Sequence, residues 1–141
     1  MQSEARRIQA TIAEVAANAE DAGRVADVAA STWRQLNAVL SPVIGPGGVT
    51  ALYQRSLYMT RSAYPCLAAV REDALRPGEF VGLQLVLSQQ TSGYIVAANG
   101  ALLQTFCDLL ASLIGASLTE RLLRSVRNLS SSGTAGEDTS S

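Results

Sequence analysis

The stretch FVGLQLVLSQQTSGYIVAANGALLQTFCDLLASLIGA, residues 80–116, decides the fold because Asp108 is its only charged side chain. Apolar stretches of this length are usually buried in a folded domain, so we expect the core to centre here. Gly115 stands where the C-terminal cap of a helix belongs. The second half therefore predicts a central buried helix, with an apolar stripe at helical spacing formed by Leu102, Phe106, Leu109 and Leu113.

The first half of this stretch fits two structures. Leu83, Leu85 and Leu87 alternate as in a strand, whereas Phe80, Leu83 and Leu87 follow helical spacing. A hairpin that turns through residues 89–93 stays open as an alternative. We favour helix across residues 80–96, because Gln, Leu and Ala outnumber the β-branched residues there.

Polar residues interrupt the apolar stretch at Asn99, Gln104, Asp108 and Ser112. A transmembrane helix needs about 20 predominantly apolar residues in succession. We therefore expect no membrane-spanning segment and no membrane partner.

Residues 1–40 carry apolar side chains at alternating spacings of four and three, which is the pattern of a heptad seam. One interpretation is a helical arm that forms a coiled coil, and the other is one or two ordinary amphipathic helices broken near Gly23. We favour the ordinary helices, because such a pattern arises easily by chance in an alanine-rich segment. On either interpretation the large apolar members form a candidate interaction surface: Ile8, Ile12, Val15, Trp33, Leu36 and Leu40.

Proline and glycine divide the middle of the chain. Pro42 and the GPGG sequence at residues 45–48 predict the end of a helix and a loop. A further helix is expected over residues 49–63. Pro65 then fits the first turn of a short helix that ends before Pro77.

The C-terminal part predicts one more helix and a tail. Ser117 and Glu120 have the spacing of a capping box, which places the start of a helix there. The sequence SSSGTAGEDTSS, residues 130–141, has too little apolar surface to bury and predicts disorder. Together these elements predict an all-α bundle of about five to seven helices in a single domain, residues 1–129, with an N-terminal arm or helix pair at 1–40, a core bundle at 49–129 and a disordered tail at 130–141.

The balance of charge limits the choice of partners. All eleven basic residues are arginine and twelve residues are acidic, which gives a formal charge of −1. A nearly neutral chain is unlike nucleic-acid-binding proteins, which carry a clustered positive footprint. The N-terminal sequence MQSEARRIQA lacks the apolar core of a secretion signal, so we expect a cytoplasmic protein.

The reactive residues of the sequence exclude several chemistries. Without histidine, the chain has no Ser-His-Asp or Cys-His catalysis and no histidine-ligated zinc or haem. Cys66 and Cys107 stand apart in apolar surroundings and are expected to be reduced core thiols. We therefore expect no metal and no cofactor.

Asp108 is the sharpest candidate for acid–base chemistry, because a carboxylate in a long uncharged stretch can have a perturbed pKa. On a helix, however, Asp108 shares a face with Gln104, Ser112 and Gly115. Such a polar stripe is more typical of a surface that faces water. We therefore favour a solvated carboxylate and expect no enzyme activity.

Two segments carry a resemblance to other proteins: GPGGVTALYQRSLYMTRSAYPCLAAV, residues 45–70, and LLQTFCDLLASLIGASLTERLLRSV, residues 102–126. They resemble a group of small, functionally uncharacterised helical proteins from proteobacteria. This resemblance implies a helical fold in a bacterial protein and no particular activity. The length and helix order also resemble the globin fold, although the missing proximal histidine excludes haem.

These observations favour a small, non-enzymatic interaction or regulatory protein that acts through protein–protein contacts or self-association. The alternative is a helical module that binds an apolar small molecule between its helices, near Trp33, Phe106 and Cys107.

Overall fold

The structure, a computed structural model, describes residues 3–18, 21–72 and 78–139. These residues contain no strand, which confirms the predicted all-α bundle. The α-helix count also lies within the predicted range. The elements are α1 (Ser3–Asn18), α2 (Ala22–Thr60), the 3₁₀ helix η1 (Pro65–Ala69), α3 (Val81–Leu87), α4 (Ser92–Ile114) and α5 (Ala116–Thr139).

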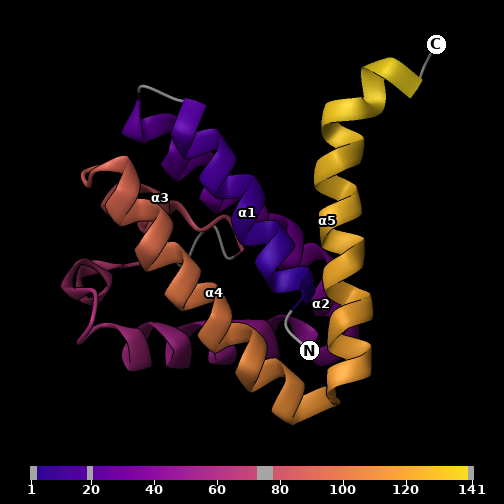
Figure 1. Cartoon of the computed structure of the whole chain (residues 1–141). Helices are drawn as coiled ribbons and strands as arrows, with labels where there is room; N and C mark the ends of the chain where they lie inside the picture. The colour runs from indigo at the N-terminus through magenta and orange to yellow at the C-terminus, as the bar shows by residue number, and fades with distance from the viewer. Residues whose placement is uncertain (1–2, 19–20, 73–77, 140–141) are drawn as a thin grey trace.

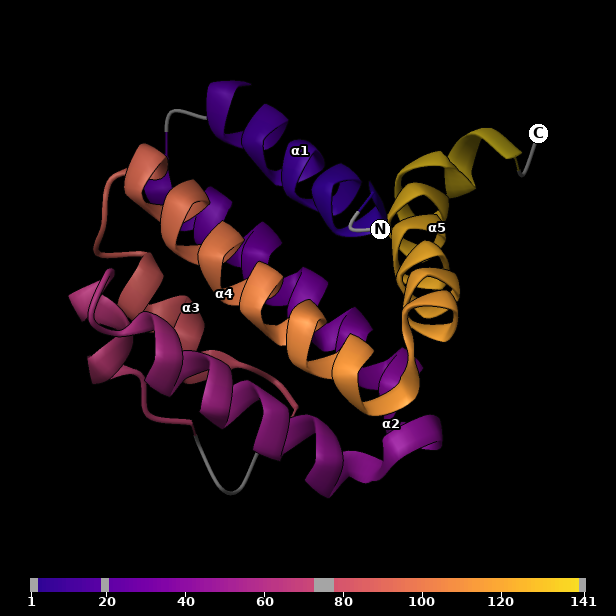
Figure 2. The same cartoon turned by 60° about the horizontal axis from the view of Figure 1, so that its bottom comes forward.

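Helix α4 lies at the centre of the bundle, as the apolar stretch predicted. It packs against α1, α2 and α5, and Figures 1 and 2 show it running beside the first part of α2. By length and composition alone α4 could also cross a membrane, so the absence of a membrane span stays a prediction. In the bundle its inward face is buried through Ile95, Ala98, Asn99, Leu102, Leu103, Phe106, Cys107 and Leu110.

Residues 81–87 and 92–96 are helical with a short turn between them, and the hairpin alternative is wrong. Two helices share this segment, because α3 ends at Leu87 and α4 begins at Ser92. Thr91 starts α4 as its N-cap, with the hydroxyl oxygen accepting a hydrogen bond from the Tyr94 N–H at 3.2 Å.

The N-terminal segment forms two helices, which decides between the one helix and the two that the sequence left open. The break falls before Gly23, because α1 ends at Asn18 and α2 begins at Ala22. Residues 19–20 lie outside the described residues. Asp21 caps α2 by accepting a hydrogen bond from the Gly23 N–H at 2.9 Å, which satisfies a donor that the first turn would otherwise leave unpaired.

The loop predicted at residues 45–48 is absent. Instead, α2 changes direction at Gly45, whose φ of 82° and ψ of 153° are open to glycine alone. Pro46 follows this kink and begins the next helical segment, where its missing N–H costs nothing. Pro42 is tolerated near the end of the preceding segment. The proline and glycine residues therefore indicate a kink of one residue at Gly45, which we call the elbow.

Three further helix boundaries were predicted, at Pro65, Gly115 and Ser117. Pro65 does open a short helix, but η1 is a 3₁₀ helix that ends at Ala69; residues 73–77, including the predicted end before Pro77, lie outside the described residues. The capping box at Ser117 is wrong, because α5 already begins at Ala116, directly after the positive-φ residue Gly115. Gly115 ends α4 as predicted.

The end of α5 projects beyond the other helices in both views (Figures 1 and 2). The backbone of α5 continues to Thr139, and residues 140–141 lie outside the described residues. The sequence predicted disorder over residues 130–141, which include this projecting end of α5. That disorder stays a prediction.

An aromatic cluster joins α2 to α3 and α4. Trp33 lies with its ring centroid 5.4 Å from that of Tyr53, 5.8 Å from Phe80 and 5.2 Å from Phe106. The Trp33 indole N–H donates a buried hydrogen bond of 2.8 Å to the side-chain oxygen of Asn99. The polar edge of the indole is thereby satisfied inside the core.

Glu72 fastens the start of α3 to this cluster. Its carboxylate accepts hydrogen bonds from the N–H groups of Gly82 and Leu83 at 3.1 and 3.2 Å, and from the Tyr53 hydroxyl at 2.5 Å. Burial, helped by the neighbouring Glu72 charge, raises the pKa of Tyr53, so this phenol keeps its proton. The close packing of this first turn of α3 requires glycine at position 82, because an added Cβ would lie 2.0 Å from the Arg71 carbonyl oxygen.

Gly82→Ala should therefore lower the free energy of unfolding by about 1–3 kcal/mol, because the backbone of Arg71 cannot move away from a new methyl group without strain. Gly93→Ala is the matched control, since its Cβ would meet nothing within 4 Å and alanine favours the helix. We expect the control to gain up to about 1 kcal/mol. Urea unfolding followed by circular dichroism measures both, and equal effects at the two positions would contradict the close contact.

Candidate functional site

The surface predicted from the N-terminal seam is buried inside the bundle. Ile8, Ile12, Trp33, Leu36 and Leu40 are all buried, and Val15 is half-buried. Because α1 and α2 both fold onto α4, the seam contacts the protein's own core. In this fold the seam does not present an interaction surface, which corrects that assignment.

The side chains predicted to line an apolar ligand site pack against one another. Trp33, Phe106 and Cys107 are buried, and the Trp33 and Phe106 rings meet edge to face. The indole N–H is already bonded to Asn99. A ligand at this place would have to displace these rings, so we find no support for the apolar-ligand alternative here.

Asp108 lies exposed on α4, in the polar stripe that the sequence indicated. Its carboxylate accepts a hydrogen bond from the Gln104 amide at 3.1 Å, and the Ser112 hydroxyl donates to the Asp108 carbonyl at 3.1 Å. This placement agrees with the solvated interpretation. Among the described residues, no group of three or more His, Cys, Asp or Glu side chains is placed to hold a metal ion.

The two cysteines differ in their surroundings. Cys107 is buried in α4, and burial raises the pKa of its thiol to about 12, so the thiol stays protonated at neutral pH. Cys66 on η1 is half-buried and packs against the core, so its thiol is less enclosed than that of Cys107.

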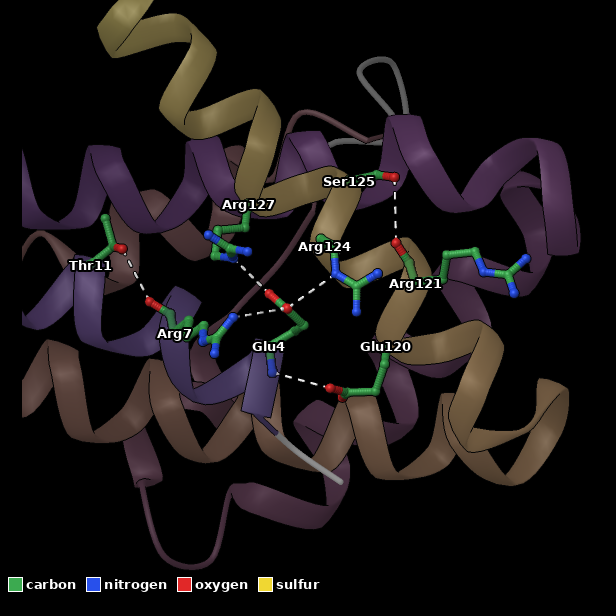
Figure 3. Close-up of polar contacts among 8 residues, drawn as sticks. All are labelled: Glu4, Arg7, Thr11, Glu120, Arg121, Arg124, Ser125 and Arg127. Atoms are coloured by element: carbon green, nitrogen blue, oxygen red, sulfur yellow. Dashed lines mark hydrogen bonds and ion pairs between the residues drawn. The ribbon is translucent and has the colours of Figure 1, made fainter.

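A charged site that the sequence reading missed lies between α1 and α5. Glu4, in the first turn of α1, is buried, and 3 % of its side chain is exposed. Figure 3 shows three guanidinium groups converging on its carboxylate. Their nitrogen–oxygen distances are 2.6 Å from Arg127 Nε, 3.4 Å from Arg124 Nε and 3.3 Å from Arg7 Nη1.

Helical spacing places these residues together. Arg7 follows Glu4 by one turn of α1, and the arginines of α5 recur every third residue at 121, 124 and 127. Glu120 adds a polar contact between the helices, because its Oε1 accepts a hydrogen bond from the Glu4 N–H at 3.3 Å. That bond satisfies a backbone donor at the start of α1, where a negative charge is also favoured by the helix dipole.

The arginines hold Glu4 in its charged form. The hydrogen bond from Arg127 is the main cause that lowers the pKa of Glu4, and the positive charges nearby outweigh the opposing effect of burial. A buried carboxylate with several charge-assisted partners is a strong tether between two helices.

The site carries more positive than negative charge. We call Arg7, Arg121, Arg124 and Arg127 the arginine face; Arg121 points away from Glu4 in Figure 3. Four guanidinium groups lie here with the two carboxylates Glu4 and Glu120, which leaves an excess of two positive charges. The side chains of Arg7 and Arg124 are 60 % and 55 % exposed, so much of this charge faces solvent.

The sequence offered only part of this site. The arginines at 121, 124 and 127 are visible in the sequence as a periodic run. Their buried counter-ion Glu4 lies more than a hundred residues earlier, and no local pattern in the sequence indicates that pairing.

No protein-family model, no curated protein and no solved structure matches the chain. The chemistry of the site therefore follows from its own geometry.

Glu4→Gln should lower the free energy of unfolding at pH 7 by about 1–3 kcal/mol, because a neutral amide replaces the acceptor of three charged donors. The lowered pKa sets the sign of the pH dependence. Charged Glu4 stabilises the fold above its ordinary pKa of 4.5, and this contribution is lost as the pH falls through the lowered value.

Urea unfolding of wild type and variant at several pH values measures this effect. The difference between them should be full at pH 7 and shrink as the pH falls below 4.5. Glu14→Gln, at an exposed position of the same helix, is the control and should change little. A difference that does not depend on pH would contradict the ionised tether.

The reactivity of the two cysteines tests the burial of Cys107. In the native protein we expect Ellman's reagent to react with Cys66 and to leave Cys107 unmodified, because the Cys107 thiol is buried and protonated. Denaturant should release the second thiol. The Cys66→Ser variant should show no rapid reaction in its native state, and a fast reaction in that variant would mean that Cys107 is accessible.

Proposed function

We propose that the protein is a non-enzymatic interaction protein that binds a protein partner through the arginine face. The observation that carries this proposal is the gathering of three guanidinium groups from two helices around one buried carboxylate, with Arg121 beside them on α5 and with Arg7 and Arg124 more than half exposed. Arginine is enriched at protein interfaces, since its planar guanidinium forms several directed hydrogen bonds.

The size of the charge excess favours a protein over nucleic acid. The face has two excess positive charges, and the whole chain has a formal charge of −1. A typical DNA-binding protein makes roughly six to ten phosphate contacts, which need more positive charge than this. A protein surface with a few carboxylates matches an excess of this size. We also keep the expectation of a cytoplasmic, bacterial protein as part of this proposal.

The reactive side chains support a non-enzymatic role. Cys107 is buried with a raised pKa, Tyr53 is buried against Glu72, and Asp108 lies in a solvated polar stripe. Each of these groups has a structural partner or a location that suits stability. A binding role therefore requires fewer assumptions than catalysis.

Photo-crosslinking in living cells of the source bacterium tests this proposal. The photoreactive residue p-benzoylphenylalanine replaces Ser125, which is exposed on α5 beside the arginines and leaves all of them in place. We expect a discrete adduct of defined mass after irradiation. The matched control carries the same residue at Gln54, an exposed position of α2, and should give no such adduct.

The masses separate the outcomes. An adduct with a different protein supports the proposal, and an adduct of twice the mass of the chain identifies self-association through the same face. The absence of any adduct at Ser125, or equal products at both positions, would contradict an interaction through the arginine face.

A further inference from the structure

Resting on the proposed function, we infer that the arginine face receives an acidic segment of the partner protein, held by the guanidinium atoms that Glu4 leaves unused. The partner is thus identified by its chemistry, as a segment that presents two or more carboxylates close together.

The hydrogen-bond geometry shows which atoms are left for a partner. Arg124 and Arg127 both reach Glu4 through Nε, at 3.4 and 2.6 Å. Since Nε holds Glu4 in both side chains, their Nη atoms are not the groups that bind it. Arg7 contacts Glu4 through Nη1 alone. Each guanidinium therefore keeps N–H donors that can bind a second carboxylate.

The buried carboxylate also places these donors in advance. An isolated surface arginine loses side-chain freedom when it binds a ligand, which weakens the interaction. Here Glu4 is itself buried and holds three guanidinium groups in one place before any partner arrives. The free energy lost in ordering those side chains is thus partly met by folding.

The charge count points to carboxylates in a pair or a short run. Glu4 and Glu120 neutralise two of the four arginines, so two acidic groups from a partner would complete the balance. Along α5 the arginines at 121, 124 and 127 are spaced by about 4.5 Å of helix rise, at about 1.5 Å per residue. Neighbouring acidic side chains of one peptide segment can meet two such positions at once.

Binding of a fluorescein-labelled octaglutamate peptide to the full chain, followed by fluorescence anisotropy at low salt, tests the inference. Octaglutamine with the same label is the uncharged control. We expect octaglutamate to bind, octaglutamine not to bind, and the affinity for octaglutamate to fall as the salt concentration rises.

Two double variants remove the same charge from different places. Arg121→Gln with Arg124→Gln removes two positions of the face while keeping Arg127, the closest partner of Glu4, and should weaken octaglutamate binding at least about fivefold. Arg55→Gln with Arg61→Gln removes two exposed arginines, one in α2 and one directly after its last residue, and should leave binding within about twofold. Thermal unfolding should show that both variants are folded.

Several results would overturn the inference. The first is an equal loss in both double variants, which would mean attraction by net charge alone. The second is the absence of octaglutamate binding. The third is tight binding of a 20-base-pair DNA duplex or of phosphatidylglycerol vesicles without binding of octaglutamate, which would assign the face to another class of partner.

These results can be told apart from failure of the proposed function. A discrete adduct at Ser125 without octaglutamate binding keeps the interaction and removes the acidic segment. Octaglutamate binding that depends on the face, without any adduct in cells, supports the chemistry and removes the cellular interaction.

Discussion

The packing of α4 into the centre of the bundle is the constraint on which the other elements depend. Its inward face meets α1, α2 and α5, and the edge-to-face contact of Phe106 with Trp33 joins it to the aromatic cluster. Asn99 allows the large indole to be buried by accepting its N–H. Because this one helix contacts most of the others, their positions are fixed by a shared surface.

Polar contacts then attach the outer elements to this core at defined points. Glu72 holds the start of α3 through two backbone N–H groups, and Glu4 holds α1 against α5 through its arginines. A directed hydrogen bond fixes orientation in a way that contacts between alanines cannot. The arginine face is therefore a product of the same contact that docks α1.

Local patterns in the sequence predicted most of the helices, because their apolar spacing and caps depend on nearby residues. The stripe through Leu102 and Phe106 and the cap at Gly115 are examples. The same patterns could not tell whether the seam through Ile8 and Trp33 packs within one chain or between chains. They also could not reveal Glu4 as the partner of Arg127, since that pairing depends on how distant helices meet.

The kink at Gly45 joins the two segments of α2 through a single residue, so it cannot accommodate a change in chain length. A loop would absorb an added or missing residue, whereas here the next helical segment starts at once with Pro46. Each inserted residue would turn that segment by about 100° about its axis, as 3.6 residues complete a turn. Val49 and Tyr53 would then leave the core. Chain length around the elbow is therefore as constrained as side-chain identity, although the elbow itself lies near the surface.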